Sequence, residues 1–265
     1  MSDAIQFECV GGIARLRFNR PEVKNALSLE MCARVRDILQ QLREDATCRV
    51  LLIEAAGTDF CSGADMGDLA SMARGTPARR AELVGQSALE FSHGIFLGLA
   101  ALDIPIVCAV RGYAVGAGFQ FALSADLVVA SETARFLAPM VNLAHSSDHG
   151  ESFVLPRKVG ELRASQILLL GQRIGAHEAE QWGIANWVVP DAGLETKVEE
   201  VVAHLAQGAP FALRAIKSLL RQSRTSNIEQ QFENELEMIA RCAATDDFAE
   251  AITAFSERRK PVYTQ

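Results

Sequence analysis

Near its start the chain alternates hydrophobic and polar residues. Two such runs, Ile5–Val10 and Ile13–Asn19, flank the pair Gly11-Gly12. A two-residue period is typical of a β-strand with one buried face, and paired glycines favour a tight turn. The pattern therefore predicts a β-hairpin over these residues.

The period changes to that of a helix after Ser28, whose side chain can cap the first turn. Apolar residues at helical spacing follow it, at Leu29, Cys32, Val35, Leu39 and Leu42. A longer helix is predicted for Pro77–Leu102, although Gly85, Gly94 and Gly98 interrupt its pattern.

Apolar runs lie between the predicted helices. Arg49–Ala56 and Ile106–Val110 are mostly apolar, as expected of strands that are covered on both faces of a sheet. Short strands are also predicted at Leu127–Ala130, Ala134–Leu137 and Asn186–Val189. Strands that alternate with helices predict an α/β fold.

The last part of the chain, Pro210–Glu257, has helical spacing and no strand signal. We therefore expect an α/β core over residues 1–200 and a helical region over residues 201–265. The apolar faces of these helices must be buried somewhere, and a neighbouring subunit is a candidate to cover them.

The composition is that of a globular protein with no nucleic-acid partner. The chain has 265 residues, of which 49% are hydrophobic and 22% charged, and its formal net charge is −7. Because binding to nucleic acid needs a basic face, we expect no such partner. The apolar runs are too short to span a membrane, so we expect no membrane partner either.

Six cysteines, at positions 9, 32, 48, 61, 108 and 242, show no CxxC spacing and mostly lie among apolar residues. We expect them to be reduced and mainly buried, which is typical of a cytoplasmic protein. Residues 1–8 include acidic side chains and no long apolar run, so we expect no secretory signal.

Two loops that contain glycine follow the buried strands, at Phe60–Met66 and Gly112–Gly118. Ligands bind at strand ends in α/β sheets, and a helix that begins near Gly118 would present free N–H groups. Two N–H groups aimed at one carbonyl oxygen stabilise an enolate or a tetrahedral oxyanion. Alternatively, the glycines only form tight turns and helix caps.

Five segments resemble the crotonase superfamily, which is also called the enoyl-CoA hydratase/isomerase superfamily. They occur in the family's order across nearly the whole chain, at Asn19–Leu27, Phe60–Asp65, Gly112–Gly118, Ala125-Asp126 and Phe255–Val262. The resemblance implies an acyl-CoA substrate from fatty acid or aromatic acid metabolism. Coenzyme A would enter as part of this substrate, with no separate cofactor and no metal.

The resemblance also implies a fold and an assembly. The fold would be a spiral of ββα turns followed by a C-terminal helical trimerisation region. The assembly would be a homotrimer or a dimer of trimers, which is a hexamer.

The resemblance also implies a set of site residues, assigned by their positions in the matched segments. The oxyanion-hole N–H groups correspond to those of Ala64 and Ala117; the family usually has glycine at the second position, but backbone donation survives the change. Family positions that line the CoA moiety correspond here to Lys24, Ala26, Ser62, Asp65 and Met66. Lys260 corresponds to a residue that can approach the CoA phosphates, or it is a solvated charge near the C-terminus.

The chain departs from the family's hydratases at their two catalytic glutamates. The corresponding residues are Gln120 and Met140, which would still line the substrate. An amide and a thioether cannot take a proton as a general base must. Hydration by two glutamates is therefore disfavoured, as is isomerisation by one of them.

Three interpretations remain open for the loop after Met140. In the first, Asp148 and His93 form a catalytic dyad, because their positions resemble those of the nucleophilic aspartate and the histidine of 4-chlorobenzoyl-CoA dehalogenase. Dienoyl-CoA isomerases also carry a catalytic acid at the aspartate position. In the second, His145, Asp148 and His149 bind a metal. In the third, Asp148 caps a helix that begins near Gly150, and His93 is buried and hydrogen-bonded.

We therefore predict an acyl-CoA lyase, isomerase or hydrolase with a backbone oxyanion hole and an altered acid–base set. One alternative is an acyl-CoA-binding protein that lacks catalysis, because both glutamates are replaced. Another is a hydrolytic, dehalogenase-like enzyme that acts on aryl-CoA. RNA binding, known for one member of the superfamily, is disfavoured by the acidic charge balance.

Overall fold

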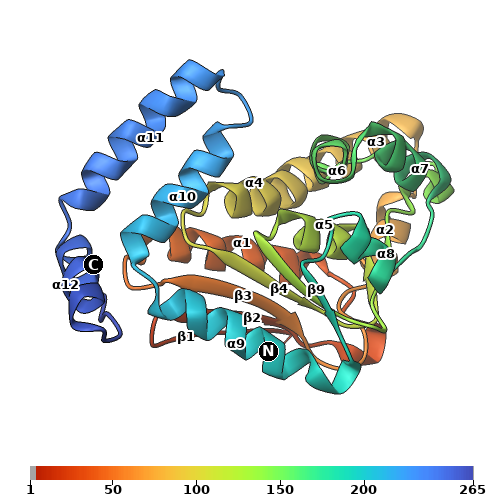
Figure 1. Ribbon diagram of the computed structural model, residues 1–265. Coiled ribbons are helices and arrows are strands. Elements are labelled where there is room, and N and C mark those ends of the chain that lie inside the picture. Colours follow the sequence, from red (N-terminus) through yellow and green to blue (C-terminus); the bar gives the residue numbers. More distant parts are fainter. Residues whose placement is uncertain (1–3, 265) are drawn as a thin grey trace.

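The computed structural model describes residues 4–264 of the chain (Figure 1). Met1–Asp3, part of the segment in which we expect no secretory signal, lie outside the described residues. The centre of the described chain is a six-stranded sheet in the order β1-β2-β3-β4-β6-β9. Its strands are β1 (Ile5–Val10), β2 (Ile13–Phe18), β3 (Val50–Ala55), β4 (Ile106–Val110), β6 (Leu127–Ser131) and β9 (Trp187–Val189).

The sheet begins with the predicted hairpin and continues as a parallel sheet. In the hairpin Ile5 pairs with Phe18 and Val10 with Ile13, and the turn glycines have φ angles of 60° and 80°. Each later pair of neighbouring strands is parallel. Parallel strands require crossover connections, which the helices provide.

The helices match most of the predicted ones. α1 (Leu29–Glu44) begins after Ser28, whose hydroxyl accepts from the Met31 N–H as expected. The other α-helices are α2 (Met66–Met72), α3 (Pro77–Ser87), α4 (Gly94–Ala101), α5 (Ala117–Ser124), α6 (Glu151–Val159), α7 (Glu161–Leu170), α8 (Ala176–Gln181), α9 (Leu194–Gln207), α10 (Pro210–Gln222), α11 (Ile228–Ala243) and α12 (Asp246–Glu257). Short 3₁₀ turns are η1 (Pro21–Val23), η3 (Met140–Leu143) and η4 (Asp191–Gly193).

Helices cover both faces of the sheet, which explains the apolar strands. α1, α4 and α5 lie on one side of the sheet, and α9 lies on the other (Figure 1). Val50, Leu52 and Val107 of the strands pack with Val198 and Val202 of α9, and all five are almost fully buried. Burial on two faces therefore accounts for the continuous apolar runs.

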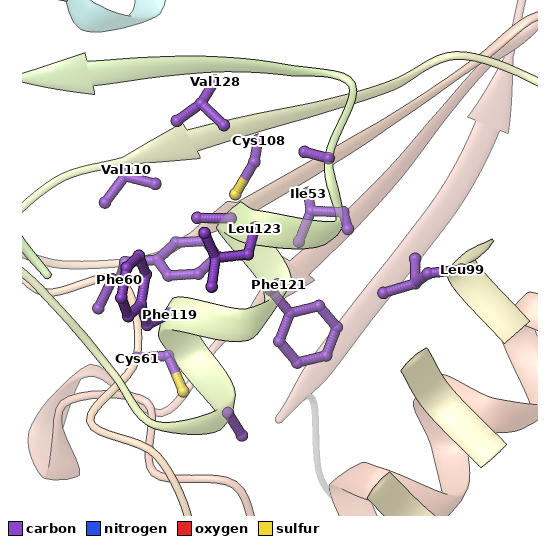
Figure 2. Close-up of a cluster of buried hydrophobic side chains, with 14 of the residues drawn as sticks. Ile53, Phe60, Cys61, Leu99, Cys108, Val110, Phe119, Phe121, Leu123 and Val128 are labelled. Carbon is purple, nitrogen blue, oxygen red and sulfur yellow. The ribbon is translucent and has the colours of Figure 1, made fainter. Parts of the chain in front are cut away.

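α5 lies inside the larger core, between the strands and α4. Figure 2 shows Phe119 and Leu123 near the side chains of β4 and β6, whereas Phe121 lies on the side of α5 that faces Leu99 of α4. The Phe121 ring meets those of Phe18 and Phe96 edge-on, with centroids 5.1 Å apart in both pairs. These contacts fix the position of the first turn of α5.

The helix predicted over Pro77–Leu102 is a chain of three segments. α3 continues into a π-helical segment, η2 (Ala88–His93), and then into α4. Gly94 and Gly98 do not break the helix: a β-carbon on either would lie 3.3 Å from a side chain of α1. These glycines allow α4 to approach α1 closely.

A second, small sheet has the order β5-β7-β8. β5 (Tyr113–Val115) and β7 (Arg135–Leu137) pair in parallel, and β8 (Ile174–Gly175) pairs antiparallel with β7. The sequence did not predict β8, because two residues are too few to show a period. This sheet holds the loop that leads into α5.

The C-terminal part is helical, as predicted, and α11 and α12 stand apart from the sheet (Figure 1). Residue 200, where we expected the core to end, lies inside α9, which packs on the sheet. Large apolar side chains are exposed along α10 to α12, at Ile216, Leu220, Ile228, Phe232, Leu236, Ile239, Phe248, Ile252 and Phe255. Within residues 4–264 no helix has the length and apolar character of a membrane span.

Candidate active site

The first wall of the candidate site is made by two loops that are bonded together at the end of β3. The Leu27 N–H donates to the Gly63 carbonyl at 2.8 Å, and the Asp65 N–H donates to the Leu27 carbonyl at 2.9 Å. In this parallel bridge Leu27 uses both of its backbone groups, so the N–H of Ala64 points away from it. Within residues 4–264 the Ala64 N–H makes no hydrogen bond.

The Asn25 side chain holds these two loops together, a role that was not predicted from the sequence. Its buried side chain donates to the carbonyls of Ala56 and Asp59, both at 2.8 Å, and accepts from the Arg20 N–H at 2.7 Å. Lys24 and Asn25 both have positive φ, 53° and 54°, which asparagine tolerates better than most residues. The signal was its place in the Asn19–Leu27 signature.

The second loop lies against the first. The Cys61 N–H donates to the Tyr113 carbonyl at 2.8 Å, and the Val115 N–H donates to the Cys61 carbonyl at 2.9 Å. Gly116 then takes φ 53° and ψ −116°, a conformation that favours glycine, and α5 begins at Ala117. Because Ala117 is the first residue of α5, its N–H has no partner inside the helix.

Two glycines keep the loops in contact. A β-carbon on Gly63 would lie 2.9 Å from the Val115 carbonyl oxygen, and one on Gly118 would lie 2.5 Å from the Cys61 carbonyl oxygen. No larger residue fits at either place without moving backbone. Ala64 follows Gly63 and Ala117 precedes Gly118, so the two predicted N–H donors lie on adjoining loops.

The predicted CoA-lining residues gather around the first loop. Lys24 Nζ lies 5.0 Å from the centre of the Tyr113 ring and 3.7 Å from the Asp59 carboxylate. The Ser62 N–H donates to the Lys24 carbonyl at 2.9 Å. Ala26 is half-buried and its carbonyl accepts from Arg20.

The start of α2 completes this group. The Asp65 carboxylate caps α2 by accepting from the Gly67 N–H at 2.8 Å and lies 3.2 Å from the Arg20 guanidinium. These contacts, with the Gly67 N–H first, lower the pKa of Asp65. Met66 is exposed beside it, whereas Lys260 lies on the exposed C-terminal segment.

Cys61 lies on the first loop, where that loop contacts the second, but its thiol is unreactive. It is fully buried, and burial raises the pKa of its thiol to about 12. A thiol that stays protonated is a poor nucleophile, so the chemistry of the site has to come from other groups.

Gln120 and Met140, which the resemblance aligns with the two glutamates of hydratases, are both buried. Gln120 is 2% exposed; its Nε2 donates to the Ser124 hydroxyl at 3.2 Å, and its Oε1 has no partner among the described residues. Met140 is 9% exposed and lies in η3. Neither side chain can take up a proton as a carboxylate does.

Asp148 is held at the junction of η2, α5 and α6. Its Oδ2 accepts from the Ser92 hydroxyl at 3.3 Å, and its Oδ1 lies 3.4 Å from Nε2 of His149. A β-carbon on Gly150 would lie 3.7 Å from Gln120 Nε2, so this loop contacts α5. The Asp148 side chain is 22% exposed.

The predicted pairing of Asp148 with His93 is not made. His93 is exposed, and within the described chain it forms no hydrogen bond or ion pair. The π-helical register of η2 instead turns Ser92, which is 8% exposed, towards Asp148. The alternative that His93 is buried and hydrogen-bonded is wrong for the same reason.

The two other interpretations of this loop are also corrected. His145, Asp148 and His149 do not form a metal site: the His145 Nδ1 contacts the Ser146 carbonyl, and only Asp148 and His149 meet. Asp148 does not cap α6 either: the N-cap residue is Gly150, and no side-chain cap hydrogen bond is made there.

A buried carboxylate that sequence reasoning missed lies three residues after Asp148. Glu151 is 0% exposed, and its Oε2 accepts from the Ser147 hydroxyl at 2.6 Å and from the His149 N–H at 3.2 Å. Its Oε1 and the Nδ1 of His149 have no partner among the described residues. The only signal was an acidic residue in a loop whose pattern departs from that of hydratases.

Comparisons with known proteins show what the chain as a whole is similar to. The family described as Enoyl-CoA hydratase/isomerase matches residues 8–265. The 1,2-epoxyphenylacetyl-CoA isomerase of Escherichia coli is 34% identical, over 96% of this chain and 95% of that protein. The trans-2-decenoyl-[acyl-carrier-protein] isomerase of Streptococcus mutans is 32% identical over 98% and 97%. A crystal structure of an enoyl-CoA hydratase from Polaromonas superposes with a TM-score of 0.90 at 30% identity, covering 98% and 99%.

Proposed function

Because this chain belongs to the enoyl-CoA hydratase/isomerase family, we propose that it is an acyl-CoA isomerase that moves a double bond along the acyl chain. The thioester oxygen binds between the N–H groups of Ala64 and Ala117. Asp148 carries the proton from one carbon to another. Of the proteins described above, two are isomerases and one is an enoyl-CoA hydratase, so the relatives support both reaction classes. The lack of a carboxylate at Gln120 and Met140 is what favours isomerisation over hydration.

The backbone donors would stabilise the enolate intermediate. Removal of a proton from C2 of a 3-enoyl-CoA, between the thioester carbonyl and the double bond, places negative charge on the thioester oxygen, and return of the proton to C4 gives the 2-enoyl product. The positive end of α5 and two free N–H groups would then face that charge without any reorganisation. Loss of one such donor costs roughly 3–4 kcal/mol in enzymes of this kind.

Asp148 suffices for the proton transfer. In a double-bond shift one base accepts a proton from one carbon, and its conjugate acid returns that proton to another carbon, so one carboxylate serves both steps. Hydration needs in addition a group that activates water. Gln120 and Met140, at the positions that supply such groups in hydratases, cannot do so.

The contacts of Asp148 are the observation that carries the proposal. Ser92 and His149 hold its two oxygens, and the side chain remains partly exposed. His149 packs on the Phe96 ring, with centroids 5.2 Å apart, and this fixes the imidazole. The carboxylate–imidazole pair of this site is therefore Asp148 with His149.

Substrate binding and assembly follow from the same family. Lys24, which lies over Tyr113, is placed to bind the CoA phosphates, together with Lys260 from this or a neighbouring subunit. The exposed apolar side chains of α10 to α12 would be covered in a homotrimer or a dimer of trimers.

The test is turnover of a 3-enoyl-CoA to its conjugated 2-enoyl isomer, followed by the absorbance of the conjugated thioester. The Asp148→Asn variant should lose at least a hundredfold in kcat while acyl-CoA binding changes little. Asp37→Asn, on the exposed face of α1, is the matched control.

Two results would contradict the proposal. Unchanged turnover in Asp148→Asn would remove Asp148 from the mechanism. Tight binding of enoyl-, aryl- and halo-acyl-CoA thioesters with no product from any of them would point to a binding protein.

A further inference from the structure

Two cysteines and an aspartate meet at the end of the sheet opposite the candidate active site. Cys9 lies on the edge strand β1, Cys48 precedes β3, and Asp45 follows α1. The Sγ atoms of Cys9 and Cys48 are 2.8 Å apart, and each of the two sulfurs lies within 4.8 Å of a carboxylate oxygen of Asp45. The active-site loops, by contrast, follow the far ends of the parallel strands.

The fold holds these three residues together. The Arg49 N–H donates to the Gly12 carbonyl at 2.7 Å, which ties the hairpin turn to the segment that carries Cys48. The Asp45 N–H donates to the Gln41 carbonyl in the last turn of α1 at 3.1 Å. The cluster is thus formed by three elements and not by one flexible loop.

The ligand types indicate a particular ion. Two sulfurs and one carboxylate oxygen are ligands that Zn²⁺ takes in tetrahedral sites, often with water as the fourth ligand. We propose that Cys9, Asp45 and Cys48 bind one Zn²⁺ ion, with a solvent molecule completing its coordination.

The charges around the cluster favour a cation. The Asp45 carboxylate is held in place, because the hydroxyl and the N–H of Thr47 both donate to its Oδ1, at 2.6 and 2.8 Å. The carbonyl end of α1 adds partial negative charge. Two arginines from this region bond elsewhere: Arg214 donates to the carbonyls of Ala46 and Cys48, and Arg49 donates to those of Ala206 and Tyr263.

Binding would open the sulfur pair and release protons. Tetrahedral coordination with Zn–S bonds of about 2.3 Å separates two sulfurs by about 3.8 Å. The two sulfurs are 2.8 Å apart, so they would have to separate by about 1 Å, and Cys9 is exposed on an edge strand where such a shift is possible. The thiols of Cys9 and Cys48 would each give a proton to solvent, Asp45 would give none, and no electron is transferred.

The experiment uses the full chain, reduced and freed of metal. Zn²⁺ is titrated in competition with a chromophoric chelator, and Cd²⁺ is titrated for its thiolate charge-transfer absorbance. We expect one equivalent bound. Cys9→Ser and Asp45→Asn, both near the surface, should each weaken binding at least tenfold. The matched control is Cys242→Ser, whose thiol lies outside the cluster and should bind as the unaltered chain does.

Several outcomes would overturn the site. Absence of thiolate absorbance, or equal affinity in Cys9→Ser, would exclude it. A peptide that links Cys9 to Cys48 in protein isolated without reductant would show a disulfide instead. Isomerase turnover is a separate readout, because none of the three residues touches the candidate active site.

Discussion

The two halves of the candidate active site are built in different ways. The two glycine loops, residues 60–65 and 112–118, offer backbone N–H groups, and glycines hold them in close contact against a core that contains aromatic side chains. The segment 139–151 offers side chains, and two of them, His149 and Glu151, keep a buried polar atom without a partner among the described residues.

This difference separates what the fold provides from what the individual sequence adds. Backbone donors such as the N–H of Ala117 do not depend on the side chain. A wall of side chains, which includes Met140, can be exchanged residue by residue. In the proposed function the loops would therefore bind the thioester oxygen, and the wall would determine the reaction.

The largest effect is expected from adding a side-chain atom where the two glycine loops touch. The Gly118→Ala substitution would place a β-carbon 2.5 Å from the Cys61 carbonyl oxygen, against backbone that cannot yield. We expect a loss of about 3 kcal/mol in the free energy of unfolding, together with loss of turnover. Urea denaturation measures the first. Gly85→Ala, in open space on α3, should instead be slightly stabilising.

The buried carboxylate tests the second half. Glu151→Ala removes the acceptor of two hydrogen bonds in a fully buried place. We expect a loss of about 2 kcal/mol in the free energy of unfolding, measured by urea denaturation. Glu151→Gln keeps an acceptor oxygen and should lose less, and the exposed Glu161→Ala should lose little. Equal losses in Glu151→Ala and Glu161→Ala would contradict this.

A sharper comparison uses two neighbours on η2. Ser92→Ala removes the hydroxyl that bonds to Asp148 and should lower kcat about tenfold, which is the effect of one lost hydrogen bond. His93→Ala removes an exposed side chain and should leave kcat unchanged. The reverse order would restore the pairing of His93 with Asp148. Steady-state kinetics on the 3-enoyl-CoA substrate decide between them.

The smallest expected effect is at Asp65. Its pKa is lowered, chiefly by the Gly67 N–H, so it stabilises the folded state above about pH 4 and loses that effect as the pH falls through its lowered pKa. Asp65→Ala should cost about 1 kcal/mol near pH 7, as for a lost helix cap. The difference between variant and unaltered chain should shrink towards pH 3, as followed by thermal unfolding. A constant difference would argue against the cap.

Much of the fold could be predicted, because it depends on periodicity and turn chemistry. The hairpin around Gly11-Gly12, the helix after Ser28 and the buried strand before Phe60 each have a local pattern. β8 has too few residues to show one. The two loops at Phe60–Met66 and Gly112–Gly118 could be identified from their glycine motifs, and the structure brings them into contact; their role as an oxyanion hole stays a prediction.

The side-chain wall was predicted less well. The position of Asp148 could be aligned, but its partners could not, because they depend on how a helix winds. Ser92 and His93 are neighbours in η2, so a shift of one residue in the helical register decides which of them faces Asp148. Glu151 is buried only because Ser147 and the His149 backbone fold around it, which no spacing in the sequence shows.

The π-helical winding of η2 affects how insertions and deletions could alter the surroundings of Asp148. A π-helical turn accommodates one residue more than the α-helical turns beside it. Deletion of one residue there would return the segment to ordinary α-helix, while Gly94 and Gly98 would keep α4 seated on α1. An insertion or deletion could thus substitute a new side chain for Ser92 as the neighbour of Asp148, and the core would not have to be rebuilt.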